Sequence, residues 1–226
     1  MTHGVRARAR GHTAVVAFLL AGALLGSALA GVLFRAVAED WKDRRIAGNE
    51  PATRRFLSRL AEVEAAFRDG RFVDADGDGR GEFGWVQDLP REPGSHLEQQ
   101  GGLVVLEGYY VLVYLPGETR AVPESSPPPE AKAGSASDGR ESHWVAYAWP
   151  VEDGSTGERA FVVSEVGQVL VTPNDEDPYE GRLEHVPGAS AAFDSTGPEP
   201  ANLGSGLAWF TGGPAVDERI WSPSRD

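Results

Sequence analysis

The feature that most constrains the fold of this chain is an apolar stretch near its N-terminus. From Gly11 to Phe34 there is no charged side chain, and from Ala14 onward almost every residue is apolar. As a helix, the 21 residues of 14–34 would extend for about 30 Å, which matches the hydrocarbon thickness of a bilayer. We therefore expect residues 14–34 to form a transmembrane helix that anchors the protein in a membrane.

The charges on either side of this stretch predict its orientation. Arg6, Arg8 and Arg10 precede it, whereas acidic and basic residues are mixed after it. Positive charge favours the cytoplasmic side, so the sequence predicts a single-pass protein of the inner membrane with a periplasmic or extracellular C-terminal domain. A cleaved signal peptide ending at Ala30 is the alternative for residues 1–35, although apolar sequence continues past that site.

The remainder of the chain is strongly acidic. After residue 35 there are 17 Lys and Arg against 34 Asp and Glu, which gives a formal charge of −17. A surface of that sign repels phosphate backbones and anionic lipid headgroups, so nucleic acid is excluded as a partner and cations are favoured. The sequence contains no cysteine, which excludes disulfides, thiolate catalysis and cysteine-ligated zinc.

Helical periodicity follows the apolar stretch. Residues 36–46 are good helix formers, and Gly48 favours a break before a second helix that begins at Asn49 and ends near Arg68. Pro51 fits the first turn of such a helix, where its missing N–H is not needed. Apolar residues at spacings of four, three and four predict one buried face, composed of Phe56, Leu60, Val63 and Phe67.

Runs rich in β-branched and aromatic residues predict an antiparallel sheet for this helix to cover. The expected strands are 109–115, 144–149, and a hairpin of 161–164 with 168–172 around Val166-Gly167. Within 144–149 the alternate residues Val145, Tyr147 and Trp149 are the bulkier set and are expected to point inward. The predicted fold class is therefore α+β, with a transmembrane helix followed by an amphipathic helix packed on a small antiparallel sheet.

Two further segments complete the predicted domain organisation. Residues 117–142 contain no aromatic residue and many small, polar and proline residues, so we expect a disordered insertion within an α+β domain of residues 36–174. Residues 175–226 predict an irregular C-terminal extension. Its isolated aromatic anchors are Phe193, Trp209, Phe210 and Trp221.

An acidic loop between the helix and the first strand carries the strongest chemical signal. Its carboxylates occupy alternate positions and are followed by Gly79, as in the first half of an oxygen-ligand calcium loop. Trp85 stands where an EF-hand needs its bidentate Glu, so a half-site is expected. The alternative is an ordinary acidic, glycine-rich turn. The candidate calcium ligands are Asp74, Asp76, Asp78 and Glu82.

These motifs follow one another in an order that resembles the pilin-like proteins related to type II secretion pseudopilins. The matching segments are NEPATRRFLSRLAEVEAAFR, FVDADGDGRGEFGWVQDLP, GYYVLVYLP and WVAYAWPVEDGSTGERAFVVSEVGQVLVT, which cover residues 49–115 and 144–172. The closest resemblance is to an uncharacterised bacterial group with a D-x-DGDG-x-x-EFG loop and a YAWP hairpin. It implies a long N-terminal helix on a small antiparallel sheet, and envelope or secretion proteins as partners. Val16 stands where prepilins carry the glutamate that follows their processing site.

The sequence lacks the major signatures of enzymatic mechanisms. It contains no nucleophile elbow, P-loop, dinucleotide-binding glycine pattern or H-E-x-x-H motif. We therefore expect a non-enzymatic structural or interaction component. The alternative is a periplasmic carbohydrate-binding module or hydrolase, in which Trp144, Tyr147 and Trp149 would form a sugar platform instead of core.

Overall fold

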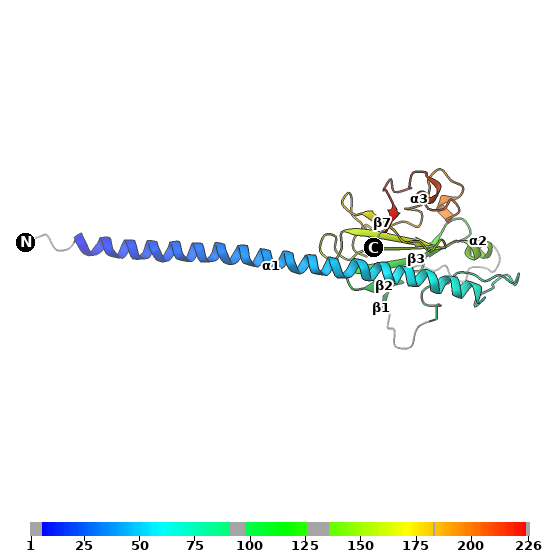
Figure 1. The fold of residues 1–226 in the computed structure, drawn as a ribbon, viewed down its shortest axis with the longest axis horizontal. Coiled ribbons are helices and arrows are strands. Elements are labelled where there is room, and N and C mark those ends of the chain that lie inside the picture. Colours follow the sequence, from blue (N-terminus) through cyan, green and yellow to red (C-terminus); the bar gives the residue numbers. More distant parts are fainter. Residues whose placement is uncertain (1–5, 91–97, 126–135, 183, 225–226) are drawn as a thin grey trace, which may run out of the picture. The chain divides into compact units, whose positions relative to one another are not determined.

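The computed structural model describes residues 6–90, 98–125, 136–182 and 184–224; the side chains of residues 6–34, 36 and 200 are outside the description. The chain forms two compact units, Met1–Arg44 and Arg45–Asp226. The second unit contains the end of the first helix and all the described strands, and Figure 1 colours the chain in sequence order from blue to red.

The first helix, α1 (Arg6–Asp69), is continuous over 64 residues. The predicted break at Gly48 is therefore wrong, and Pro51 lies inside the helix. Asn49 does not cap a helix; its Nδ2 donates to the carbonyl oxygen of Thr156 over 2.9 Å. The buried Glu50 accepts hydrogen bonds from the backbone N–H of Glu158 at 3.1 Å and from Nε of Arg159 at 2.7 Å. These tertiary contacts hold the turn in helical form although proline removes one backbone donor.

The predicted transmembrane helix is not supported by the described residues. Among the residues whose side chains the structure describes, no helix is long and apolar enough to cross a membrane. The segment predicted to do so, 14–34, lies where α1 side chains are outside the description. In the remaining part of α1, charged residues recur every few positions and interrupt any apolar run. The predictions of a membrane anchor and of an inner-membrane location are therefore contradicted.

An eight-stranded antiparallel sheet forms the centre of the second unit. Its order is β1-β2-β3-β5-β6-β7-β8, with β4 paired to β3. The strands are β1 (Glu98–Gln100), β2 (Leu103–Leu106), β3 (Tyr109–Leu115), β4 (Val122–Pro123), β5 (Val145–Pro150), β6 (Arg159–Ser164), β7 (Leu170–Pro173) and β8 (Ser222–Pro223). The chain is thus α+β, but the predicted small sheet is wrong, because four further strands, β1, β2, β4 and β8, extend it.

The strands predicted from composition agree with β3, β5, β6 and β7 to within two residues. The turn between β6 and β7 lies where it was expected, with Gly167 at a φ of 79°. This left-handed conformation is one that glycine adopts without steric cost.

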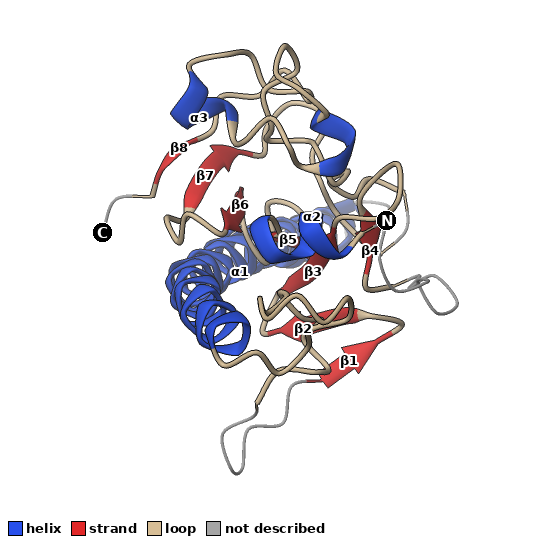
Figure 2. Ribbon diagram, turned by 90° about the vertical axis from the view of Figure 1, so that its right-hand side faces the viewer, coloured by secondary structure: helices blue, strands red, loops and turns tan. Residues whose placement is uncertain are grey.

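One face of the sheet is covered by the C-terminal part of α1 (Figure 2). Small residues of β5, Ala146 and Ala148, lie opposite Val113 and Val111 of β3 in the register and allow the helix to approach closely. The buried helical residues differ from the predicted stripe: Phe56 and Val63 are only partly buried. The helix residues buried in this layer are Leu57, Leu60, Ala61 and Phe67.

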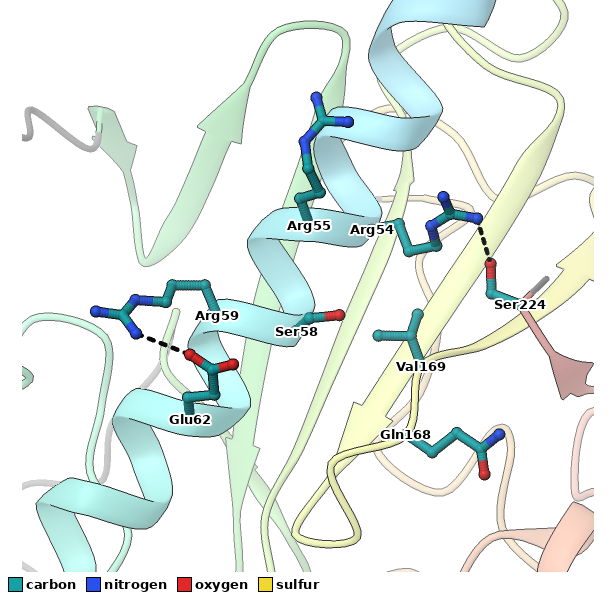
Figure 3. Close-up of a pocket in the computed structure, with 8 residues that line it drawn as sticks. All are labelled: Arg54, Arg55, Ser58, Arg59, Glu62, Gln168, Val169 and Ser224. Atoms are coloured by element: carbon teal, nitrogen blue, oxygen red, sulfur yellow. Dashed lines mark hydrogen bonds and ion pairs between the residues drawn. The ribbon is translucent and has the colours of Figure 1, made fainter. Parts of the chain in front are cut away.

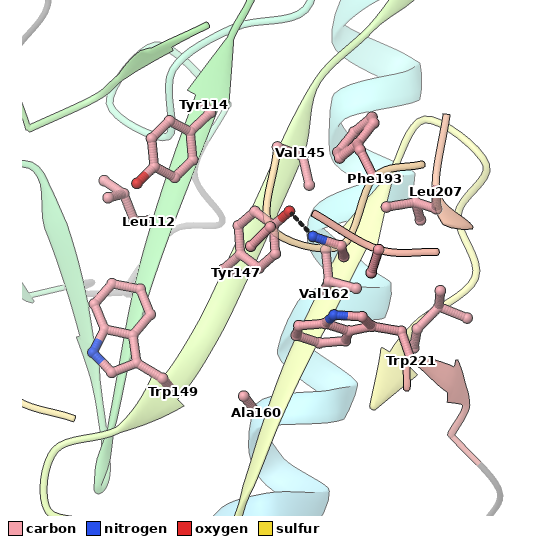
Figure 4. Close-up of a cluster of buried hydrophobic side chains, with 14 of the residues drawn as sticks. Leu112, Tyr114, Val145, Tyr147, Trp149, Ala160, Val162, Phe193, Leu207 and Trp221 are labelled. Carbon is pink, nitrogen blue, oxygen red and sulfur yellow. Dashed lines mark hydrogen bonds between the residues drawn. The ribbon is translucent and has the colours of Figure 1, made fainter. Parts of the chain in front are cut away.

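The opposite face of the sheet is covered by the C-terminal extension. Tyr147 and Trp149 point inward as predicted, but into this second layer and away from α1 (Figure 4). The Tyr147 hydroxyl donates to the carbonyl oxygen of Ala189 at 3.0 Å and accepts from the N–H of Ala192 at 3.0 Å. Both faces are therefore buried, so the extension is part of the core.

The extension contains little regular structure, namely η1 (Pro200–Asn202), α3 (Ala208–Thr211) and β8. Of its predicted anchors, Phe193 and Trp221 are buried, whereas Trp209 and Phe210 are exposed. Burial of the first two is made possible by local turns, among them the bond from the N–H of Ala208 to the carbonyl oxygen of Ala192.

The predicted disordered insertion, 117–142, is regular at both ends. Its first part contains β4, and its last part forms α2 (Ser137–Ser142). Residues 126–135 are outside the described residues. The ends are ordered because they bond to the rest of the domain: the N–H of Glu124 donates to Val113, and the N–H of Phe83 donates to the carbonyl oxygen of Arg140 in α2.

Candidate metal centre

The acidic loop follows α1 directly and is shaped by close backbone contacts. The N–H of Glu82 donates to the carbonyl oxygen of Val73 over 3.0 Å and closes the loop. A Cβ atom added at Gly81 would lie 1.8 Å from the carbonyl oxygen of Arg68, so only glycine allows this approach to the helix end. Gly77 and Gly79 have φ values of 76° and 89°. Positive φ favours glycine because glycine has no Cβ atom.

Within this loop the three aspartates converge. Oxygens of Asp74, Asp76 and Asp78, three of the four predicted ligands, all lie within 4.8 Å of one another. Asp74 accepts the N–H of Gly77 at 2.8 Å and that of Gly79 at 3.1 Å. Asp76 and Asp78 each accept the N–H two residues further on, at 3.1 and 2.8 Å. These bonds turn the loop around its own carboxylates.

Glu82, the fourth predicted ligand, is placed differently. It is buried, and its Oε1 accepts the N–H of Ala75 at 3.0 Å and the hydroxyl of Ser137 at 2.6 Å. The structure does not bring Glu82 into either group of described carboxylates that lie close enough to share an ion. Glu82 instead fastens the loop to the start of α2.

A second group of carboxylates joins the loop to α2. Oxygens of Asp76, Asp138 and Glu141 also lie within 4.8 Å of one another. Asp138 and Glu141 were missed because they belong to the segment predicted to be disordered. The only signal for them was the short run of Asp138, Arg140 and Glu141, which does not identify a site by itself.

Glu141 has the most unusual environment in this group. It is 8% exposed; its Oε2 lies 3.5 Å from a guanidinium nitrogen of Arg80, and its Oε1 is buried with no hydrogen-bond partner among the described residues. Burial raises the pKa of the Glu141 carboxyl, and the negative charges of Asp78 and Asp76 raise it further. A hollow of about 380 Å³, lined by Arg80 and Glu141 among others, opens beside the group.

A separate hollow of about 310 Å³ lies between α1 and the turn before β7 (Figure 3). Its helix side carries three arginines, of which Arg54 donates to the hydroxyl of Ser224 at 3.4 Å and Arg59 donates to Glu62 at 2.7 Å. Arg55 points along the helix away from Ser224 in the same view. The lining residues do not converge on one point.

The aromatic residues considered for sugar binding have structural positions, and the described histidine His143 lies beside a carboxylate. His143 lies 3.3 Å from Glu165, which raises the pKa of the imidazole, and His96 is outside the described residues. Trp144, Tyr147 and Trp149 are almost completely buried, so they are core residues and offer no stacking surface.

The comparisons with known proteins give no family. The sequence matches no protein-family model, and neither the curated proteins nor the solved structures contain a match.

Proposed function

We propose that this chain is a non-enzymatic component of a protein assembly, with a pilin-like domain stabilised by calcium at the acidic loop. An exposed apolar pair on α1 carries the proposal. Val37 and Trp41 are 55% and 66% exposed and are four residues apart, so they share one face of the helix. Packing of this exposed pair against another protein would remove apolar surface from water, which favours association.

The architecture of the second unit supports the same proposal. A helix that covers one face of an antiparallel sheet is what the resemblance to pseudopilins implies, and residues 45–69 of α1 have this position. The layer on the other face is filled by the extension, so the protein uses both sheet faces for its own core. Exposed residues such as Trp41 would therefore make the contact of α1 with a second copy or with a helix of a secretion assembly.

We expect the full chain to self-associate and Trp41→Glu to weaken this association by about tenfold, because a carboxylate cannot be buried in an apolar contact. Sedimentation velocity over a concentration series measures the effect. Trp209→Glu is the matched control, since Trp209 is also exposed but lies in the C-terminal extension. A chain that stays monomeric at all concentrations, or equal effects of both substitutions, would contradict the proposed role of this face.

Calcium is expected to raise the melting temperature of the full chain by several degrees, because an ion that binds only the folded state stabilises it. Asp76→Ala should abolish the rise, since Asp76 belongs to both groups of carboxylates. Circular dichroism melts with calcium and with EDTA measure this. Glu62→Ala, at an exposed position on α1, should leave the rise intact. No heat on titration with millimolar calcium would refute calcium binding.

A further inference from the structure

We infer that calcium is held between the acidic loop and α2, by Asp76, Asp138 and Glu141, so that one ion ties the two segments together. This inference rests on the proposed calcium binding and assigns it a ligand set that the loop sequence does not contain. Asp76 lies more than sixty residues before Asp138 and Glu141 in the sequence, and the three residues present oxygens within 4.8 Å of one another.

The buried carboxylate of Glu141 is the observation that points to an ion. Its Oε1 is shielded from water and has no donor among the described residues. A buried carboxylate oxygen without a partner is costly, and a bound cation removes that cost. Arg80 compensates only in part, because its guanidinium is 3.5 Å from the other oxygen and is largely exposed.

Asp74 and Glu82 each accept two hydrogen bonds from the fold, whereas Asp76 accepts one, from the N–H of Asp78. Both oxygens of Asp74 accept backbone N–H groups, and Oε1 of Glu82 accepts two hydrogen bonds. Those bonds set the shape of the loop whether or not an ion is bound. Asp76 is the loop residue whose oxygen lies near those of Asp138 and Glu141.

The number of carboxylate ligands favours calcium over magnesium. Three carboxylates are hard oxygen ligands, which suit both ions. Calcium accepts about six to eight oxygen ligands in a flexible geometry, whereas magnesium keeps several waters and is usually bound by about one or two carboxylates.

The test is calorimetric titration of CaCl₂ into the full chain after treatment with EDTA. Glu141→Gln and Asp138→Asn are expected to weaken calcium binding by about tenfold or more, because each removes one ligand charge. Glu62→Gln, which removes an exposed carboxylate on α1, is the matched control and should leave the affinity unchanged. If Asp74→Asn abolishes binding while Glu141→Gln does not, the ion is held by the loop alone and this inference is wrong.

Arg80 provides a second measurement with the opposite sign. Its guanidinium lies beside Glu141 and Asp78, so it repels a cation at the inferred site. Arg80→Gln is therefore expected to tighten calcium binding by about threefold. An unchanged affinity in Arg80→Gln counts against a site at Glu141.

The outcomes separate this inference from the proposed function. Absence of any calcium binding by the unsubstituted chain refutes both. Calcium binding that is lost in Asp76→Ala but is unchanged in Glu141→Gln refutes this inference alone. The melting temperature of Glu141→Gln in EDTA should not fall, because the substitution removes a negative charge next to Asp76 and Asp78; a large fall would show that the residue acts in folding only. Equal affinity for MgCl₂ would refute the assignment to calcium.

Discussion

Between pH 4.5 and pH 8 the ionisation of Glu64 should lower the free energy of unfolding by an amount on the order of 4 kcal/mol. Glu64→Gln should abolish this decrease. Glu64 lies on α1 and is fully buried against the sheet. Its Oε2 accepts the N–H of Gly84 at 3.1 Å, and its Oε1 has no partner among the described residues. Burial raises the pKa of Glu64 from 4.5 to about 8, and the charge of Glu124 adds to the rise.

The sign of this dependence follows from proton binding. The folded state keeps the Glu64 proton up to about pH 8, whereas the unfolded state releases it near pH 4.5. Between these values the folded state binds more protons, so stability is lost as the pH rises and is constant above the folded pKa. Glutamine cannot ionise, so Glu64→Gln should be the more stable protein at pH 8.

Urea unfolding at several pH values measures the Glu64 effect. Glu62→Gln is the control, because Glu62 lies two residues before Glu64, on the exposed side of the same helix. Its pH dependence should match that of the unsubstituted chain. Some slope should remain in Glu64→Gln, since burial also raises the pKa of Glu124. A pH-independent difference between Glu64→Gln and the unsubstituted chain would show that Glu64 ionises normally in the folded state.

Trp221→Ala should destabilise the domain by about 3 to 5 kcal/mol, the usual cost of deleting a large buried aromatic side chain. Trp221 is 3% exposed, and its ring meets that of Tyr147 edge-on with centroids 6.0 Å apart. Its Nε1 donates to the carboxylate of Asp217 at 3.1 Å. The substitution leaves a cavity between β5 and the extension.

Trp209→Ala is the matched control, because Trp209 lies in the same extension but is 48% exposed. We expect it to change the free energy of unfolding by no more than about 0.5 kcal/mol. Denaturant unfolding followed by far-UV circular dichroism avoids the loss of tryptophan fluorescence. Comparable losses in the two variants would show that the extension is not a specific core layer.

The central strands could be predicted because their signal is local. Val111 to Leu115, Val145 to Trp149 and Phe161 to Val163 are runs of β-branched and aromatic residues, and they form the middle of the sheet. The strands Val122–Pro123 and Ser222–Pro223 could not be predicted, because each is two residues long and too short to give a strand pattern in the sequence. The same holds for α2, whose polar sequence reads as a loop.

The helix face was predicted almost correctly, and its error is informative. The pattern of Phe56 and Val63 favoured a face that is rotated from the one actually buried, which contains Leu57 and Glu64. Hydrophobic periodicity assigns glutamate to solvent, so it cannot place a carboxyl in the core. The acidic loop shows the same limit: its aspartates are read from local spacing, but Glu141 reaches them only through the tertiary fold.

The contacts of Asn49 and Glu50 determine how the second unit would bear mechanical load. They lie a few residues after the boundary at Arg44 and bind α1 to the β5–β6 connection through Thr156, Glu158 and Arg159. Tension along α1 reaches these hydrogen bonds and the ion pair before it reaches the apolar contacts of Leu57. Under such tension, these hydrogen bonds must therefore break before the helix can separate from the sheet.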